Sequence, residues 1–343
     1  MRNVKLAVIG FGNVGRAFIK TIALKRMVIS MEYGIEINVV AVADSKGMVV
    51  EADGLTSYEM LKLCELLRSE IRLFSSYAKP SVDIAEIYDK TAPDIHVELT
   101  PSNYATGEPG YTNIMFAIKR GAHVVTANKA PLALHFREII EEARARKLEV
   151  KFGATVMGGT PFLEVLSSMR SHDIERAEGI LNATTNYILT EMHEEPIDFD
   201  EAPRRAQALG VAEADPTLDI KGFDAAAKLT IISHVVGKPI RIDEVRRESL
   251  AGVKLKDVLD AVKQRRVLKY IASLDLREKS ASVKIEKVPR SSIFARVSGT
   301  LNRARVKSDA AELFLIGKGG GGTETAHTVL DDVIDIALRW LYG

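Results

Sequence analysis

The glycine-rich turn GFGNVG at 10–15 is the sequence feature that most constrains the fold. An apolar run, VKLAVI at 4–9, precedes it, and a helix-forming run, RAFIKTIAL at 16–24, follows it. G-x-G-x-x-G between a strand and a helix is typical of a dinucleotide-binding unit, whereas the alternative is a turn that only joins the two elements. Gly10 permits the tight turn, Gly12 lets the backbone approach a pyrophosphate, and Gly15 lets helix and strand pack closely. The sequence therefore predicts an α/β fold with a Rossmann-type, doubly wound parallel sheet.

The residues around this turn indicate which dinucleotide the chain binds. Asn13 and Val14 begin the helix, where free N–H groups and the helix dipole favour the anionic pyrophosphate. The second strand, INVVAVAD, ends at Asp44, where such folds place an acid on the adenosine ribose. Asp44 favours NAD, but Ser45 and Lys46 follow at once and are able to meet a 2′-phosphate. NAD and NADP both remain open.

Two further loops follow predicted strands. The strand at 95–99 leads to Thr100 and Pro101, and the short β-branched strand at 123–126 leads to Asn128 and Lys129. Ligands of doubly wound sheets bind outside the carboxyl ends of the strands. We therefore expect Thr100 and Pro101 to contact the nicotinamide side of the cofactor, and we favour a functional Lys129 over a solvated one.

Composition excludes several classes of partner. The chain has 343 residues, enough for two domains, and its 47 lysines and arginines nearly balance 46 aspartates and glutamates, for a net charge of +1. This balance gives no reason to expect binding to nucleic acid or to an anionic membrane. No apolar run has the length of a membrane span. The single cysteine, Cys64, cannot form an intrachain disulfide, so we expect a cytoplasmic protein.

The second half of the chain predicts a separate α+β domain. A helix at 258–264 is followed by strand-like runs at 266–275, 281–288 and 292–299, which we interpret as antiparallel strands of a sheet that supports pairing into a homodimer. We expect residues 1–150 to form the dinucleotide-binding domain and 151–316 the domain for substrate binding, catalysis and dimerisation. The glycine run and terminal helix, at about 317–343, are expected to pack back on the first domain.

The segment 206–228, AQALGVAEADPTLDIKGFDAAAK, concentrates charged residues at the start of a buried helix. Gly222 lets a helix begin, and the run at 223–236 is apolar nearly all round, which predicts burial. Asp224 and Lys228 are spaced i,i+4 and share one face of that helix. The alternative is an ordinary surface bridge.

Two more carboxylates, Glu213 and Asp219, lie on the approach to this helix. Three carboxylates and one amine in one pocket suit a small polar substrate that carries its own ammonium group. Solvated helix caps are the alternative.

This segment resembles the signature of the homoserine dehydrogenases, A-x3-G-V-A-E-x-D-P-x2-D-I-x-G-x-D-x3-K. The matching positions are Ala206, Gly210, Glu213, Asp215, Pro216, Asp219, Gly222, Asp224 and Lys228. The resemblance covers nearly the whole chain. It implies an NAD- or NADP-dependent oxidoreductase that reversibly reduces L-aspartate 4-semialdehyde to L-homoserine, in the biosynthesis of threonine, methionine and isoleucine.

The resemblance also implies roles for individual residues. Lys228 is expected to donate the proton, Lys129 to position the substrate near the nicotinamide, and Asp224 to orient Lys228. Glu213 and Asp219 are expected to hold the substrate's ammonium group.

Two loops complete the site that the resemblance implies. Thr184 and Thr185 either bind the substrate carboxylate or cap the helix that follows. In the glycine run, Gly319 and Gly321 are expected to approach the nicotinamide.

The sequence departs from the family pattern at Gly153, Ala183 and Val211. Relatives that bind a monovalent cation supply one carboxylate and backbone oxygens. Here the carboxylate position is Gly153, which leaves only the backbone groups of Val156, Gly158 and Thr160. The resemblance therefore does not predict a complete cation site.

Other interpretations make different demands on the sequence. Aspartate and diaminopimelate dehydrogenases would deaminate their substrate and lack the central signature. A dinucleotide-sensing regulator without chemistry would need a DNA-reading helix or a basic face. The chain ends soon after the terminal helix, so we expect no added regulatory domain and no threonine feedback through one.

Overall fold

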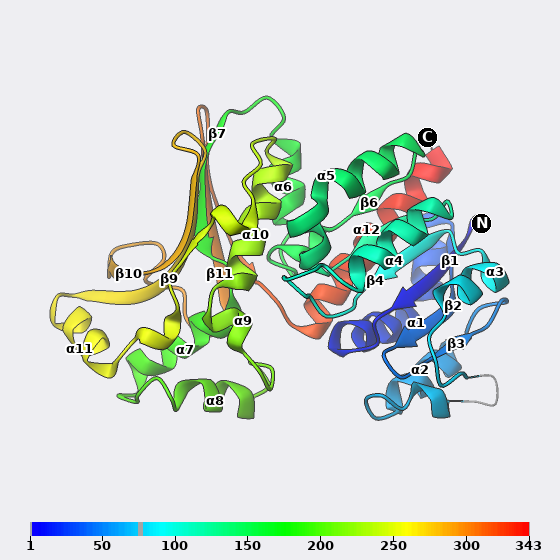
Figure 1. Ribbon diagram of the computed structural model, residues 1–343, viewed down its shortest axis with the longest axis horizontal. Coiled ribbons are helices and arrows are strands. Elements are labelled where there is room, and N and C mark those ends of the chain that lie inside the picture. The colour runs from blue at the N-terminus through cyan, green and yellow to red at the C-terminus, as the bar shows by residue number, and fades with distance from the viewer. Residues whose placement is uncertain (1, 75–77, 343) are drawn as a thin grey trace. The chain divides into compact units, whose positions relative to one another are not determined.

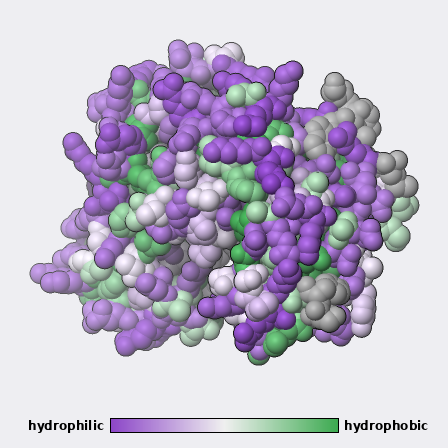
Figure 2. Space-filling view, turned by 45° about the vertical axis from the view of Figure 1, so that its right-hand side comes forward, coloured by the Kyte–Doolittle hydropathy of each residue, from purple (hydrophilic) through white to green (hydrophobic). Residues whose placement is uncertain are grey.

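The computed structural model describes residues 2–74 and 78–342, which fall into two compact units (Figure 1). The first unit comprises residues 1–155 and 321–343, and the second comprises residues 156–320. Within the described residues, no helix combines the length and the apolar character needed to cross a bilayer. Figure 2 shows a mostly hydrophilic surface on the visible face, with hydrophobic residues in scattered patches.

The first unit contains a six-stranded sheet in the order β3-β2-β1-β4-β5-β6. The parallel strands are β1 (Arg2–Ile9), β2 (Ile35–Asp44), β4 (Ile95–Glu98), β5 (His123–Thr126) and β6 (Val150–Lys151), and β3 (Gly47–Val50) is antiparallel to β2. This order confirms the predicted Rossmann-type sheet. The antiparallel strand β3 was not predicted, because the sequence gives only four strand residues directly after a tight turn.

The helices of the first unit join and cover these strands. They are α1 (Asn13–Tyr33), α2 (Ser57–Glu65), α3 (Ile84–Thr91), α4 (Gly110–Lys119), α5 (Lys129–Ala145) and α12 (Gly322–Tyr342), with 3-10 turns at Ile71–Leu73 and Gly153–Thr155. Phe18 and Ile22 of α1 are buried in the same apolar core as Val329 and Val333 of α12. The last helix of the chain thus packs in the unit that contains the first strand.

The second unit contains another six-stranded sheet, in the order β12-β11-β7-β9-β10-β8. Its strands are β7 (Ile174–Ile180), β8 (Arg246–Arg247), β9 (Arg266–Asp275), β10 (Ser280–Pro289), β11 (Leu301–Ser308) and β12 (Glu312–Lys318). All neighbouring strands are antiparallel except β8 and β10. The predicted α+β character of this half is therefore confirmed.

Helices α7 and α10 contact the central strand β9 of this sheet. The helices of the unit are α6 (Phe162–Ser168), α7 (Ala183–Glu194), α8 (Ala202–Ala208), α9 (Thr217–Ile220), α10 (Phe223–Val235) and α11 (Leu255–Lys263), with 3-10 turns at Ile242–Glu244 and Leu250–Gly252. Gly222 precedes α10 with φ of 77°, a left-handed conformation that favours glycine. The buried helix predicted at 223–236 is confirmed.

The prediction of a strand at 292–299 is wrong. This segment forms turns, and Phe294 and Val297 pack into a small apolar cluster with Ile271 of β9. Side chains satisfy its backbone: Lys269 donates to the carbonyl of Val297, and Asn186 donates to the carbonyl of Gly299 at 3.0 Å. The alternating apolar pattern reflects this packing instead of strand pairing.

Candidate functional site

The glycine turn of the first unit has the geometry that a dinucleotide requires. A Cβ atom on Gly10 (φ of 113°) would lie 2.3 Å from the carbonyl carbon of Leu99, and one on Gly15 would lie 2.1 Å from the Gly10 oxygen. A Cβ on Gly12 would meet no atom within 4 Å. Gly12 also begins α1 without a side-chain cap. The space beside Gly12, at the N-terminus of α1, is therefore open, which fits the approach of a pyrophosphate to the helix start.

The end of β2 carries the two residues expected at the ribose. The Asp44 carboxylate accepts a hydrogen bond from the backbone N–H of Lys46 at 2.6 Å, within the turn that leads into β3. Lys46 is exposed in this turn. Asp44 therefore shapes the loop that presents Lys46. This hydrogen bond uses only one of the two carboxylate oxygens of Asp44.

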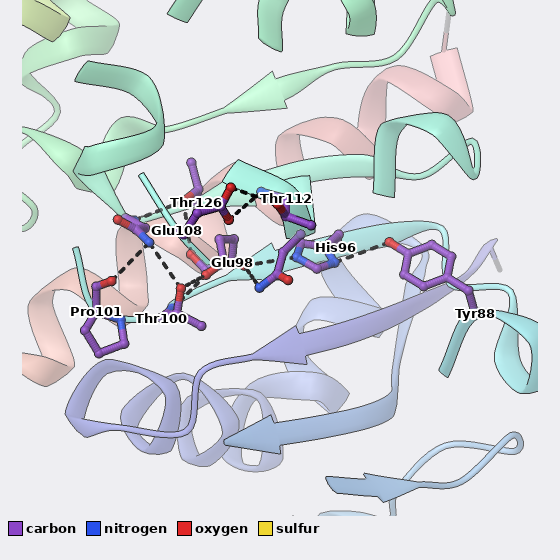
Figure 3. Close-up of polar contacts among 10 residues, drawn as sticks. Tyr88, His96, Glu98, Thr100, Pro101, Glu108, Thr112 and Thr126 are labelled. Carbon is purple, nitrogen blue, oxygen red and sulfur yellow. Dashed lines mark hydrogen bonds and ion pairs between the residues drawn. The ribbon is translucent and has the colours of Figure 1, made fainter. Parts of the chain in front are cut away.

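A buried polar network lies under the loop that follows β4 (Figure 3). The carboxylate of Glu98 accepts from the backbone N–H of Thr100 and from the side-chain amide of Asn113, both at 2.9 Å. His96 lies 3.4 Å from Glu98 and 3.3 Å from the hydroxyl of Tyr88. Burial raises the pKa of Tyr88, so its hydroxyl keeps its proton. The sequence signal for this network was a histidine and a glutamate two residues apart inside a short buried strand.

Asn128 joins this loop to the one that follows β5. Its side-chain amide donates to the hydroxyl of Thr100 at 3.1 Å and to the carbonyl of Pro101 at 3.5 Å. Its amide oxygen accepts from the hydroxyl of Ser102 at 2.8 Å and caps the start of α5. Lys129 is the first residue of that helix, and it is half-buried. The structure thus brings together Thr100, Pro101 and Lys129 at one edge of the sheet.

In the second unit, Lys228 and Asp224 form a buried ion pair on α10. The lysine Nζ lies 2.7 Å from the Asp224 carboxylate, and the two side chains are only 6% and 12% exposed. The same Nζ donates to the backbone carbonyl of Leu181 at 2.6 Å. The i,i+4 pair predicted from the sequence is therefore present, and the surface-bridge alternative is wrong.

Asn182, which sequence reasoning missed, connects this pair to Asp219. Its amide nitrogen donates to Asp219 and to Asp224, at 2.8 Å in each case. Burial, followed by the charge of Asp224, raises the pKa of Asp219 to about 6, against opposing effects of Asn182, Lys228 and Thr184. A carboxylate cluster with one buried ammonium group therefore lies at the junction of α7, α9 and α10.

The other residues expected to bind substrate have different surroundings. The N–H and hydroxyl of Thr185 both donate to the side-chain oxygen of Asn182. Asn182 is therefore the cap of α7, and Thr185 lies inside the helix as the residue that is capped, so the prediction that Thr185 caps the helix is wrong. The Thr184 hydroxyl donates to the carbonyl of Val211 at 3.5 Å, and Thr184 also bonds to Asp219. Glu213 is exposed between α8 and α9, where its carbonyl accepts from Gln207 at 3.3 Å.

Val156, Gly158 and Thr160 were expected to offer backbone groups to a cation. Their segment is hydrogen-bonded to the end of β12 and to the start of the glycine run. Gly158 donates to the carbonyl of Gly319 at 3.3 Å, and the hydroxyl of Thr160 donates to the carbonyl of Lys318 at 3.3 Å. A Cβ on Gly319 would lie 2.0 Å from the buried side chain of Asn302, and Gly321 has φ of 113°.

In the first unit, the N–H of Gly153 donates to the carboxylate of Asp332 at 2.9 Å. Across residues 2–74 and 78–342, no group of three or more His, Cys, Asp and Glu side chains is arranged to hold a metal ion.

Comparison with known proteins agrees with this geometry. Residues 10–152 match the family model described as "Homoserine dehydrogenase, NAD binding domain", and residues 161–334 match the model "Homoserine dehydrogenase". The homoserine dehydrogenase of Methanocaldococcus jannaschii is 36% identical over 96% of this chain and 98% of its own length.

Two further relatives name a cofactor. The "NAD(+)-dependent homoserine dehydrogenase" of Pseudomonas canavaninivorans is 32% identical over 98% of this chain and 97% of its own length. A solved hyperthermophilic archaeal homoserine dehydrogenase in complex with NADPH has a TM-score of 0.82 and 30% identity, and the match covers 98% of each chain. Since both domain models and relatives of nearly full length match, the chain belongs to the homoserine dehydrogenase family.

Proposed function

We propose that this chain catalyses the reversible, NAD(P)-dependent interconversion of L-homoserine and L-aspartate 4-semialdehyde. Members of the family are NAD(P)-dependent oxidoreductases, and both family models match here. The observation that carries the proposal is the buried Lys228–Asp224 pair beside Asp219. A buried ammonium group among carboxylates suits an amino-acid substrate on which an alkoxide forms.

Lys228 supplies the proton in this proposal. Bound NAD(P)H supplies the hydride that reduces the aldehyde carbon. An ammonium group has three N–H donors, and two of those of Lys228 are directed at Asp224 and Leu181. We assign the third to the substrate oxygen, where it stabilises the developing negative charge and then transfers its proton. Asp224 orients the lysine for this transfer.

The remaining polar groups bind the substrate's ends. Asp219 and Glu213 hold its ammonium group. The hydroxyl of Thr184 turns from the carbonyl of Val211, to which it donates at 3.5 Å, to the substrate's carboxylate, and Thr185 supports this loop through its bonds to Asn182, the cap of α7. Lys129, at the start of α5, positions the substrate near the nicotinamide.

The cofactor residues in this proposal lie on the loops at the carboxyl edge of the first sheet and in the glycine run that follows β12. The open space at Gly12 supports a pyrophosphate there. Asp44 accepts hydrogen bonds from the ribose of NAD, and the exposed Lys46 meets the 2′-phosphate of NADP. Thr100 and Pro101, with Gly319 and Gly321, flank the nicotinamide.

We also propose a cytoplasmic homodimer that acts in the biosynthesis of threonine, methionine and isoleucine. The second unit supports pairing, because β12 is an edge strand and its Phe314 and Ile316 are 46% and 54% exposed. Exposed apolar side chains on an edge strand favour association with another chain. The single cysteine is consistent with a reducing compartment.

The test is the initial rate of L-homoserine oxidation at alkaline pH, with NAD and NADP in parallel, for the wild type and Lys228→Ala. We expect turnover by the wild type and its loss in the variant, with cofactor binding retained. Equal loss of cofactor affinity would show that Lys228 is not the donor. Folded wild-type protein that binds a cofactor without turnover would refute the proposed reaction.

A further inference from the structure

Asn182 uses every polar atom of its side chain to join three elements of the second unit. It lies between β7 and α7 and is only 6% exposed. Its amide oxygen accepts from the N–H of Thr185 at 2.8 Å and caps α7. Its amide nitrogen donates to Asp219 on α9 and to Asp224 on α10. These two carboxylates are therefore held by one side chain that comes from a third element.

The chemistry of a primary amide suits this position. Two neighbouring carboxylates repel one another, and their burial increases the cost of both charges. The NH2 group of asparagine has two donors, one for each carboxylate, while its oxygen remains free to cap a helix. A hydroxyl has only one donor, and a carboxylate has none. Among the side chains of this size, asparagine alone performs all three tasks.

We propose that Asn182 is a positioning residue of the reaction, whose amide holds Asp219 beside the Asp224–Lys228 pair so that the substrate's ammonium group binds next to the proton donor. This role rests on the proposed function. The geometry supports it directly, because Asp224 receives both the Asn182 amide at 2.8 Å and the Lys228 ammonium at 2.7 Å.

The proposal has a consequence for the pH dependence. The charged and polar groups that face Asp219 are Asp224 and Lys228 from α10, and Asn182 and Thr184 from the start of α7. Burial and Asp224 raise the pKa of Asp219 to about 6, whereas the Asn182 hydrogen bond lowers it. Without that bond the carboxyl group is protonated at a higher pH and no longer attracts an ammonium group. The acid limb of kcat/KM for L-homoserine should then move to higher pH.

The test compares Asn182→Ser and Asn182→Asp with the wild type. Both replacements are good helix caps, but serine is too short to reach the carboxylates and aspartate cannot donate to them. We expect the acid limb to move up by about one pH unit in Asn182→Ser, since a hydrogen bond to a charged group stabilises it by about that much, and by more in Asn182→Asp, which adds a third carboxylate beside Asp219 and Asp224. KM for L-homoserine at pH 6 should rise about fivefold in Asn182→Ser, because the ionised fraction of a carboxyl group with a pKa of about 6 falls by that factor when the pKa rises by about one unit, and cofactor affinity should stay unchanged.

Asn186→Ser is the matched control. Asn186 also lies on α7 and is buried, but its amide donates to the carbonyls of Gly299 and Leu301. Its loss should lower the thermal unfolding temperature without moving the acid limb.

The outcomes separate the two proposals. An acid limb that stays in place in both Asn182 variants, in enzyme whose wild type oxidises L-homoserine, would overturn the role of Asn182 and leave the reaction standing. An equal shift in Asn186→Ser would also overturn it, because the effect would be merely structural. Absence of wild-type turnover would overturn the proposed function and this role together.

Discussion

Replacing Lys228 with methionine keeps an unbranched side chain and removes the ammonium group. The change should lower both the free energy of unfolding and the turnover, and the two effects can be measured separately. The lysine Nζ contacts Asp224 at 2.7 Å and the Leu181 carbonyl at 2.6 Å, and its side chain is 6% exposed. Breaking a buried ion pair by removing one partner costs about 3–5 kcal/mol. Loss of a general acid lowers turnover by about 10²- to 10⁴-fold.

The stability loss should depend on pH. Lys228 lowers the pKa of Asp219, which is nevertheless raised to about 6 in the folded protein from about 4 in the unfolded chain. A carboxyl group with a raised folded-state pKa contributes stability that is fully present below the unfolded pKa and is lost as pH rises through the folded pKa. Without Lys228 this loss extends to higher pH. The free-energy deficit of Lys228→Met should therefore be larger at pH 8 than at pH 5.

A double variant separates the two effects. Adding Asp224→Asn to Lys228→Met removes the unpaired carboxylate, so it should restore much of the stability and none of the activity. The assays are thermal unfolding at pH 5 and pH 8 and the kcat of L-homoserine oxidation. Wild-type stability of Lys228→Met at both pH values would refute the buried pair. Recovery of activity in the double variant would refute Lys228 as the proton donor.

Four further variants test other parts of the structure. Asp44→Ala should weaken NAD binding more than NADP binding in fluorescence titrations, and a greater loss for NADP would place the acid away from the ribose. Gly12→Ala should keep the unfolding temperature and weaken cofactor binding, because its Cβ enters the open space where the pyrophosphate is expected. Gly15→Ala should lower the unfolding temperature, because its Cβ would lie 2.1 Å from a backbone oxygen. A lower unfolding temperature for Gly12→Ala than for Gly15→Ala would contradict the assigned glycine roles. Burial and nearby positive charges lower the pKa of His193 to about 4, so the unfolded chain binds a proton there first, and stability should fall as pH drops from about 6.5 towards 4. His193→Gln should remove this part of the acid sensitivity in thermal unfolding curves, and an unchanged curve would show that His193 does not contribute.

Local patterns predicted much of the fold. The glycine turn at 10–15 predicted the Rossmann-type sheet, and the apolar run after Gly222 predicted α10. The segment at 292–299 misled because Lys269 and Asn186, far away in the sequence, satisfy its backbone. Such contacts leave no mark in the local pattern.

The same limit explains which site residues were found. Asp224 and Lys228 were predicted to pair because helical periodicity places residues four apart on one face. The role of Asn182 depends on carboxylates 37 and 42 residues further along the chain. Lys129 follows the strand β5, as expected, and the structure adds that it begins α5, where Asn128 supplies the cap. These relations follow from tertiary packing, which one sequence does not display.

The measurement that tests the central claim most directly is product analysis of L-homoserine oxidation. The proposed mechanism oxidises the alcohol carbon, so an aldehyde should form in a one-to-one ratio with NADH or NADPH, and no ammonia should be released. Ammonia released in proportion to the reduced cofactor would mean that the chain deaminates its substrate, which would contradict the assigned reaction.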